Sequence, residues 1–153
     1  MSPEPTIRPA GIDDAASIAN VYLRSFDAAL PTVRRAHSDD EVRDWVRHVL
    51  VPGGGVWVAQ TDDLVVGMLS LADDWLEQLY VDPDWQRGGI GTLLLSLAKR
   101  QAPAGLQLRT FQVNRTAQHF YERHGFQVVE RTDGSQNEEH EPDARYVWRP
   151  TER

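Results

Sequence analysis

The stretch that most constrains the fold of this chain lies near its middle, from Trp75 to Lys99. Its first part carries strand-forming side chains and ends at Asp82-Pro83, because proline has no amide hydrogen to give to a ladder. A turn with glycine at positions 88, 89 and 91 follows. The apolar residues then recur at helical spacing, at Ile90, Leu93, Leu94, Leu97 and Ala98. The pattern therefore predicts a strand, a glycine turn and a helix in direct succession.

A glycine turn that opens a helix gathers unpaired backbone N–H groups and the positive end of the helix dipole at one point. Such a point binds phosphate or pyrophosphate. Two common motifs of this kind are excluded. A P-loop needs a lysine before its Ser or Thr, where this chain reads Ile90-Gly91-Thr92, and a dinucleotide fingerprint needs a third glycine where Leu94 stands. These residues alone also allow an alternative, in which the turn only joins the strand to the helix and binds no phosphate.

The composition limits the classes of protein that the chain can belong to. With 153 residues, 41% of them hydrophobic, the chain is expected to form one domain, 1–153, with a single sizeable core. The absence of cysteine excludes disulfides, thiolate metal sites and a cysteine nucleophile. The net charge of -7 argues against a general nucleic-acid binder. No apolar run approaches the roughly 20 residues that span a bilayer, and no signal-peptide pattern opens the chain, so a cytoplasmic location is expected.

The remaining apolar and turn patterns predict the other elements. Strands are expected at 7–10, 56–60, 64–71, 106–113, 126–131 and 145–148. One helix is expected to begin at Asp13 or Asp14 and to run to about Phe26. A second is expected to start at the capping box Ser38–Glu41, and another to run from Asn114 as N-cap to Gly125. This order predicts an α/β protein of the α+β type, with a mixed sheet flanked by helices.

Two motifs resemble those of the GCN5-related N-acetyltransferase (GNAT) superfamily. The first is Gln86-Arg-Gly-Gly89-Ile-Gly91, which fits the signature (Gln/Arg)-x-x-Gly-x-(Gly/Ala) and follows Leu-Tyr-Val-Asp-Pro. The second is Asn114-x-x-Ala117-x-x-Phe120-Tyr121-Glu122-x-x-Gly125-Phe126, at a fitting distance downstream. The elements before the two motifs also match the superfamily's N-terminal half in order.

The resemblance implies the GNAT fold, a mixed and mostly antiparallel sheet of about seven strands flanked by four helices, with splayed central strands. It implies acetyl-CoA as cosubstrate and no metal. The pantetheine arm is expected in the splay, paired to the backbone around Leu79, Tyr80 and Val81. The pyrophosphate is expected on the amides of the turn, and Gln86 and Asn114 are expected as further contacts. The turn residues concerned are Arg87, Gly88, Gly89, Ile90, Gly91 and Thr92.

The resemblance also implies a role for Tyr121. When an amine attacks a thioester, the tetrahedral intermediate must expel a thiolate, and a nearby phenol can donate a proton or hydrogen bond to that sulfur. A backbone N–H near Leu79 or Val81 is expected to hold the oxyanion. The alternative for Tyr121 is a buried aromatic on the inner face of its helix.

The general base has more than one candidate. The acceptor amine arrives protonated, and Glu77 resembles the acidic residue that some aminoglycoside acetyltransferases carry on this strand. Strand alternation predicts that Glu77 shares a face with Leu79 and Val81. A solvated glutamate is the alternative, and Asp73, Asp74 and His119 remain other candidates.

The expected function is acetyl transfer from acetyl-CoA to a primary amine of a small molecule, by direct attack in a ternary complex. A protein N-terminus or lysine is the second choice, and a non-catalytic CoA-binding or sensing module is an alternative from another class. Glu138, Glu139 and Glu141 lie between the last two predicted strands, and they are expected to attract a cationic acceptor unless the loop is merely solvated. No nucleic-acid or membrane partner is expected, and monomer and homodimer both stay open.

Overall fold

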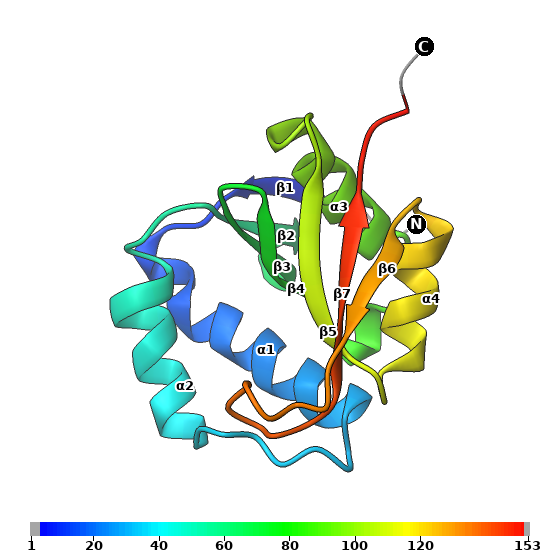
Figure 1. Cartoon of the computed structure of the whole chain (residues 1–153). Helices are drawn as coiled ribbons and strands as arrows, with labels where there is room; N and C mark the ends of the chain where they lie inside the picture. Colours follow the sequence, from blue (N-terminus) through cyan, green and yellow to red (C-terminus); the bar gives the residue numbers. More distant parts are fainter. Residues whose placement is uncertain (1–3, 152–153) are drawn as a thin grey trace.

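The computed structural model of the chain describes residues 4–151, which form a sheet of seven strands in the order β1-β2-β3-β4-β5-β7-β6 (Figure 1). Only the β4–β5 pair is parallel; the other neighbouring pairs are antiparallel. The predicted mixed and mostly antiparallel sheet is therefore confirmed. The strands are β1 (Thr6–Pro9), β2 (Val56–Thr61), β3 (Leu64–Ala72), β4 (Trp75–Val81), β5 (Leu106–Phe111), β6 (Gln127–Arg131) and β7 (Asp143–Trp148).

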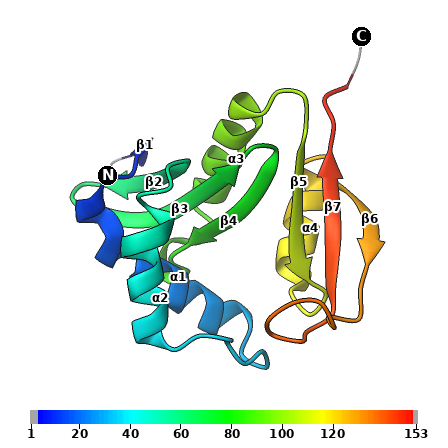
Figure 2. The ribbon, with the colours of Figure 1, turned by 60° about the vertical axis from the view of Figure 1, so that its left-hand side comes forward.

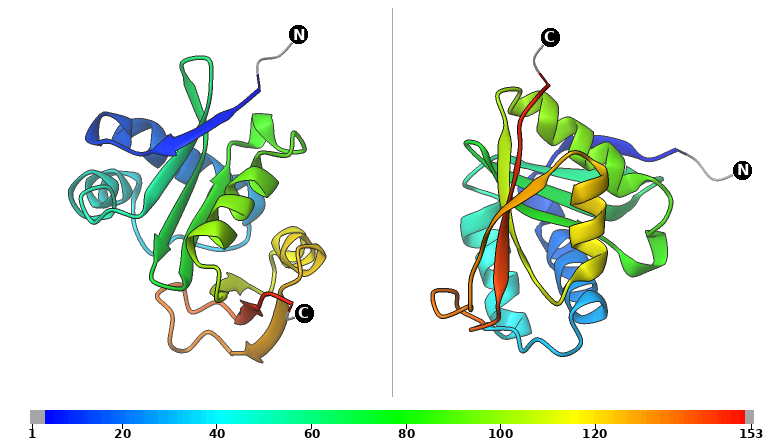
Figure 3. Two further views of the ribbon diagram at one scale, coloured as in Figure 1. Left: turned by 90° about the horizontal axis from the view of Figure 1, so that it is seen from above. Right: turned by 45° about the vertical axis from the view of Figure 1, so that its right-hand side comes forward.

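Four α-helices flank this sheet, as expected: α1 (Ala15–Ala29), α2 (Asp39–Trp45), α3 (Ile90–Gln101) and α4 (Arg115–Arg123). A π-helical segment, Val46–Leu50, continues α2. Viewed from above, α1 and α2 lie on one side of the sheet and α3 and α4 on the other (Figure 3). Each pair buries its own apolar core against the sheet, as both sides of a sheet of this kind require.

The helix caps follow the sequence at two of the three predicted starts. Ser38 Oγ accepts a hydrogen bond from Glu41 N–H (3.2 Å) and the Glu41 carboxylate accepts one from Ser38 N–H (3.0 Å), which confirms the capping box of α2. Asn114 Oδ1 accepts from Ala117 N–H (3.0 Å) and caps α4. Asp14 precedes α1 but does not cap it, because its carboxylate is taken by Gly11 N–H and Arg8 (both 2.8 Å).

The buried face of α3 differs from the predicted stripe at one position. Leu93 is 43% exposed, whereas Leu95 is fully buried beside Leu94 in the core. Three consecutive leucines occur here, and helical periodicity alone does not decide on which side of Leu94 the buried stripe widens. The packing of α3 on the sheet makes that choice.

The two central strands splay apart. β4 and β5 pair only at Trp75 and Gln107, next to a hydrogen bond from Gln107 N–H to the Asp74 carbonyl (2.9 Å). Beyond this pair the strands separate toward Val81 and Phe111, as Figure 2 shows. The splayed central strands implied by the resemblance are confirmed.

A β-bulge interrupts β4 at Glu77. Leu71 of β3 pairs with Leu76, and Ser70 pairs with Gln78, so Glu77 is an extra residue on β4. The bulge interrupts strict alternation, and Leu76, Leu79 and Val81 all pack on the core beside α3 and α4.

One further property of the helices concerns membranes. Within residues 4–151, none of them combines the length and the apolar character needed to cross a bilayer. The cytoplasmic location stays a prediction.

Candidate active site

Two cavities flank the splayed end of β4. The first, here called the turn cavity, has a volume of about 530 Å³ and is lined by β4, the glycine turn and α4, including Leu79, Val81, Arg87 and Tyr121. The second, the loop cavity, has a volume of about 710 Å³ and is lined by α1, α2, β4 and the β6–β7 loop, including Trp45 and Glu139. Tyr80 lines both cavities, so they adjoin at this residue.

The glycine turn leaves donors free at the start of α3. Gly89 is the N-cap residue and has no side chain with which to cap the helix, and the intrahelical bond to its carbonyl comes from Leu93 N–H (3.0 Å). The N–H groups of residues 90–92 therefore have no acceptor within the helix. Arg87 (φ 73°) and Gly89 (φ 82°) both have left-handed backbone, which creates the tight turn. This arrangement suits a diphosphate, with the Arg87 guanidinium close by.

The predicted cosubstrate residues fall into two groups. Those that line the turn cavity are Leu79, Tyr80, Val81, Gln86, Arg87, Gly91 and Asn114. Gly88, Gly89 and Thr92 are exposed and do not line it, and Ile90 is buried in the core. At these four positions only the backbone is suited to the predicted contact.

The backbone of β4 also offers donors to the splay. Asp82 N–H donates to the Val66 carbonyl of β3 (2.8 Å). Because backbone groups alternate in direction along a strand, the N–H groups of Leu79 and Val81 point away from β3, toward the gap left by β5. The Val81 carbonyl is already satisfied, by Ser25 Oγ (2.8 Å) and Gln86 Nε2 (3.1 Å). Gln86 therefore braces β4 in this structure.

Tyr121 combines a buried ring with an unpaired hydroxyl. The residue is 7% exposed, and its ring packs edge-on against Phe120 (5.3 Å between centroids) and Phe126 (5.4 Å). Burial raises the pKa of its phenol, which keeps the proton in place. Among residues 4–151 the hydroxyl has no hydrogen-bond partner, although the residue lines the turn cavity. The ring therefore packs in the core, as one of the two alternatives drawn from the sequence expected, and the role of the hydroxyl in catalysis stays a prediction.

Tyr146 of β7 holds α4 in place. Its hydroxyl donates to the Glu122 carboxylate (2.8 Å) and contacts Gln118 Oε1 (3.3 Å), both on α4. Burial and the nearby Glu122 carboxylate raise the pKa of Tyr146 to about 12, so this bond persists at any physiological pH. The neighbouring Tyr121 is thereby tied to the sheet.

The position of Glu77 corrects the prediction made from strand alternation. Because of the bulge, Glu77 does not share the side of Leu79 and Val81; it lines the loop cavity, on the side of α1 and α2. The other proposed bases line neither cavity: Asp73 and His119 are exposed, and Asp74 accepts a hydrogen bond from Gln107 Nε2 (3.0 Å).

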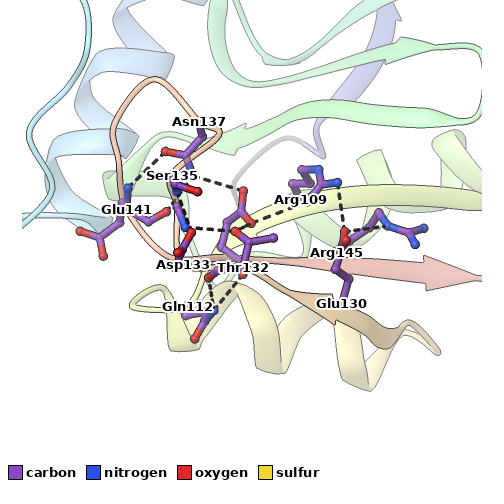
Figure 4. A network of polar contacts seen from close by, with 11 residues as sticks. Arg109, Gln112, Glu130, Thr132, Asp133, Ser135, Asn137, Glu141 and Arg145 are labelled. Carbon is purple, nitrogen blue, oxygen red and sulfur yellow. Dashed lines mark hydrogen bonds and ion pairs between the residues drawn. The ribbon is translucent and has the colours of Figure 1, made fainter.

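The β6–β7 loop forms one wall of the loop cavity and is held by its own polar network (Figure 4). Asn137 Nδ2 donates to the Glu141 carbonyl (2.7 Å), and Asn137 Oδ1 accepts from Glu141 N–H (3.2 Å). Gly134 has φ 84°, and a Cβ at this position would overlap the backbone of Glu141. Glu138 and Glu139 line the cavity but Glu141 does not, which removes Glu141 from the acidic residues expected at the acceptor.

The loop cavity is lined by both aromatic rings and carboxylates. Tyr22 lies 5.0 Å from Tyr80 and 6.1 Å from Trp45 between ring centroids. The carboxylates that line the cavity are those of Glu41, Glu77, Glu138 and Glu139. Burial raises the pKa of Glu139, and the exposed His37 contacts Glu138 across the rim (2.7 Å). Within residues 4–151 no group of three or more side chains is placed to hold a metal ion.

Several lining residues were not predicted from the sequence. Ser25 lines the turn cavity and braces the Val81 carbonyl. Arg24, which lines neither cavity, pairs with Asp82 and Asp84 (both 3.0 Å) and ties α1 to the segment just before the glycine turn. Tyr22 of α1 and Trp45 of α2 line the loop cavity. No local signal marks these residues, because α1 and α2 reach the site only through the tertiary fold.

Comparisons with known proteins agree with this geometry. Residues 52–128 match the family model described as Acetyltransferase (GNAT) domain. The chain is 32% identical over 131 residues to the peptidyl-lysine N-acetyltransferase YjaB of Salmonella typhimurium, covering 83% of this chain and 86% of the relative. The solution structure of apo YjaB from Escherichia coli matches with a TM-score of 0.79 at 26% identity, over 94% of this chain and 97% of that one.

A further solved structure shows the same fold. It is the PaiA N-acetyltransferase from Thermoplasma acidophilum in complex with coenzyme A, with a TM-score of 0.72 at 21% identity over 96% of this chain and 99% of that one. The family match and the YjaB relative confirm the resemblance seen in the two motifs. The chain belongs to the GNAT superfamily of acetyl-CoA-dependent N-acetyltransferases.

Proposed function

We propose that this enzyme transfers the acetyl group of acetyl-CoA, bound in the turn cavity, to a cationic primary amine bound in the loop cavity. The observation that carries the proposal is that the two cavities lie at the splay of β4 and adjoin at Tyr80. Both substrates can therefore be bound at once, with the amine directed at the thioester. Acetyl-CoA supplies an activated acyl group, and the chain supplies orientation and proton transfers.

The residues present fit the cosubstrate. The free N–H groups of residues 90–92 and the Arg87 guanidinium are suited to a diphosphate. The N–H groups of Leu79 and Val81 point into the splay, where they are suited to pair with the pantetheine amides and to hold the oxyanion. Asn114 lines the same cavity beside the start of α4.

Two side chains are proposed to move protons. Tyr121 donates a hydrogen bond or its phenolic proton to the departing sulfur, since its hydroxyl has no other partner among residues 4–151. Burial raises its pKa, which keeps the hydroxyl protonated and favours the hydrogen bond over full proton transfer. Glu77 takes a proton from the incoming ammonium group, directly or through a water molecule. Its place in the loop cavity, on the acceptor side of β4, supports this role.

The lining of the loop cavity favours a positively charged acceptor. Aromatic faces and carboxylates both attract a cation, and this cavity carries Tyr22, Trp45 and Tyr80 together with four glutamates. These four carboxylates outnumber the one arginine of the lining, Arg109, which is itself paired with Glu130 (3.1 Å). The name of the YjaB relative makes the ε-amine of a protein lysine the leading acceptor, which the sequence alone placed second. A small polyamine or other amine is the second candidate, because a cavity of about 710 Å³ is large enough for a whole small molecule.

An amine panel tests the proposal directly. Acetyl-CoA is incubated with Nα-acetyl-lysine amide, lysine-bearing peptides, spermidine and free amino acids, while thiol release and product masses are followed. We expect release coupled to an acetylated amine, and faster turnover with lysine amide or a peptide than with neutral amines. Thiol release without any acetylated product would contradict the proposed transfer.

Glu77→Gln is expected to remove the acidic limb of the pH–rate profile, because the variant has no carboxylate to accept the proton. A loss in kcat of about 10²-fold is typical for a general base. The measurement is kcat as a function of pH with saturating substrates. An unchanged acidic limb would assign the role to water or to another residue.

Glu138→Gln and Glu139→Gln are each expected to raise the KM for a cationic amine by about threefold to tenfold, because an attractive charge is lost at the cavity wall. The KM for acetyl-CoA is expected to stay the same, and the salt dependence of the amine KM is expected to weaken. Glu141→Gln is the matched control, since Glu141 belongs to the same loop but does not line the cavity. Equal effects from all three substitutions would indicate a merely solvated loop.

The raised pKa of Glu139 gives this prediction a pH dependence. As pH falls through the raised pKa, the carboxylate takes up a proton and loses its attraction for the ammonium group. The KM for the amine is therefore expected to rise on acidification. The rise is expected to begin at a higher pH than it would if Glu139 had the pKa of an ordinary glutamate. In Glu139→Gln this part of the profile is expected to disappear.

A further inference from the structure

His124 joins the end of α4 to two points on α3. It is the C-cap residue of α4 and precedes Gly125, whose φ is 89°. Its Nε2 lies 3.3 Å from Thr92 Oγ1, in the first turn of α3, and its carbonyl accepts a hydrogen bond from Lys99 Nζ (2.6 Å). Thr92 and Lys99 are two helical turns apart, so they lie on one side of α3.

The imidazole is also fixed within α4 itself. Nδ1 lies 2.8 Å from the Phe120 carbonyl, and the ring packs on the Phe120 ring with 4.6 Å between centroids. A carbonyl only accepts, so Nδ1 carries the hydrogen; in the neutral ring Nε2 is then an acceptor and the Thr92 hydroxyl is the donor. This arrangement gives His124 a defined tautomer and a defined orientation.

The contact between the Lys99 ammonium and the His124 carbonyl is stabilised by its surroundings. It is the single lysine of the chain, and its ammonium lies 4.9 Å from the centroid of the Trp148 ring and 5.8 Å from that of Phe126. A cation at this point complements the negative end of the α4 dipole. The main chain of His124 is thereby held against α3, independently of the imidazole.

These contacts connect two parts of the proposed site, the glycine turn and the segment of α4 that carries Tyr121. Thr92 belongs to the turn whose backbone is proposed to hold the diphosphate, and Tyr121 lies one helical turn before His124 on α4. Phe120, the neighbour of Tyr121, packs against the start of α3, since a Cβ at Gly91 would meet its ring at 3.4 Å. A shift of α4 along α3 would therefore change the distance between the bound thioester and the phenol.

We propose that His124 is a positioning residue, which uses its bond to Thr92 to keep the Tyr121 hydroxyl in register with cosubstrate held on the glycine turn. The inference rests on the proposed function, in particular on the role of Tyr121. A purely structural helix cap would need the bond to Phe120 and the contact with Lys99, but not the bond to Thr92.

The test combines Thr92→Val, which removes the hydroxyl at nearly constant volume, with His124→Asn, which keeps a donor for the Phe120 carbonyl but is too short to reach Thr92. The readouts are thiol release from acetyl-CoA, with Nα-acetyl-lysine amide and again with water as acceptor, the Kd for CoA and the Tm. Each variant is expected to lose about tenfold in kcat, since a displacement of 1 Å can cost up to about 100-fold. Thr92→Ser restores the hydroxyl, and it is expected to recover most of the kcat that Thr92→Val loses.

Two comparisons decide the matter. The double variant is expected to be no slower than either single variant, because both substitutions remove the same hydrogen bond, the one between His124 and Thr92. In a Tyr121→Phe background, His124→Asn is expected to lower kcat no further. Additive losses, an unchanged kcat in Thr92→Val, or a further loss in the Tyr121→Phe background would overturn the inference while leaving the proposed function standing. Wild-type kcat in Tyr121→Phe alone would instead remove the proposed role of Tyr121, and with it the inference.

Discussion

Replacing Gly89 with aspartate is expected to weaken the binding of CoA by about 100-fold or more, because a like charge opposite the diphosphate costs several kcal/mol. The new carboxylate stands at the N-terminus of α3, where it competes for the free N–H groups of residues 90–92. The fold is expected to persist, since a Cβ at Gly89 meets no atom within 4 Å. Isothermal titration with CoA measures the affinity, and circular dichroism checks the fold.

Gly89→Ala is the matched control for this substitution. It adds the same Cβ and the same strain at φ 82°, but no charge, so it is expected to keep most of the affinity. Gly91→Asp is also expected to weaken the binding of CoA, although less cleanly, because Gly91 belongs to α3 and its Cβ would stand in van der Waals contact with the Phe120 ring, at 3.4 Å. Wild-type affinity in Gly89→Asp would contradict the placement of the diphosphate on this turn.

The second large effect is expected from Tyr121→Phe. The substitution keeps the packing against Phe120 and Phe126 and deletes only the hydroxyl, which has no partner in the described part of the chain. A general acid contributes about 10²–10⁴-fold, so a loss of at least about tenfold in kcat is expected if thiolate expulsion matters. The Kd for CoA and the Tm are expected to stay the same.

The pH profile of the wild type provides a check on the same residue. Because burial raises the pKa of Tyr121, the phenol stays protonated where an ordinary tyrosine would lose its proton. The activity due to Tyr121 is therefore expected to persist through the range near pH 10, where free tyrosine ionises. A Tyr121→Phe variant with wild-type kcat would show that water protonates the leaving thiolate.

Much of the fold could be predicted because its signals are local. The approximate places of the strands and helices, the Ser38 capping box and the Asn114 cap each involve residues close in sequence, and these are confirmed. The seven-stranded sheet and its splay were implied by the resemblance rather than by any pattern, and they are confirmed as well.

The features that were not predicted depend on tertiary contacts. The bulge at Glu77 arises from a register shift against β3, and it places the carboxylate in the loop cavity, away from the side of Leu79 and Val81. The packing of α3 decides between Leu93 and Leu95. The aromatic wall of the loop cavity and the bracing by Ser25 depend on where α1 and α2 lie against the sheet. No spacing along the chain encodes these outcomes.

The measurement that tests the central claim most directly is a set of initial rates, with acetyl-CoA varied at several fixed concentrations of the accepted amine. Two cavities that adjoin at Tyr80 allow both substrates to be bound together, and the chain has no cysteine to carry the acetyl group. Double-reciprocal plots are therefore expected to intersect, as a ternary complex requires. Parallel lines, together with a mass increase of the enzyme by one acetyl group, would show a covalent acetyl-enzyme and contradict direct transfer across the splay.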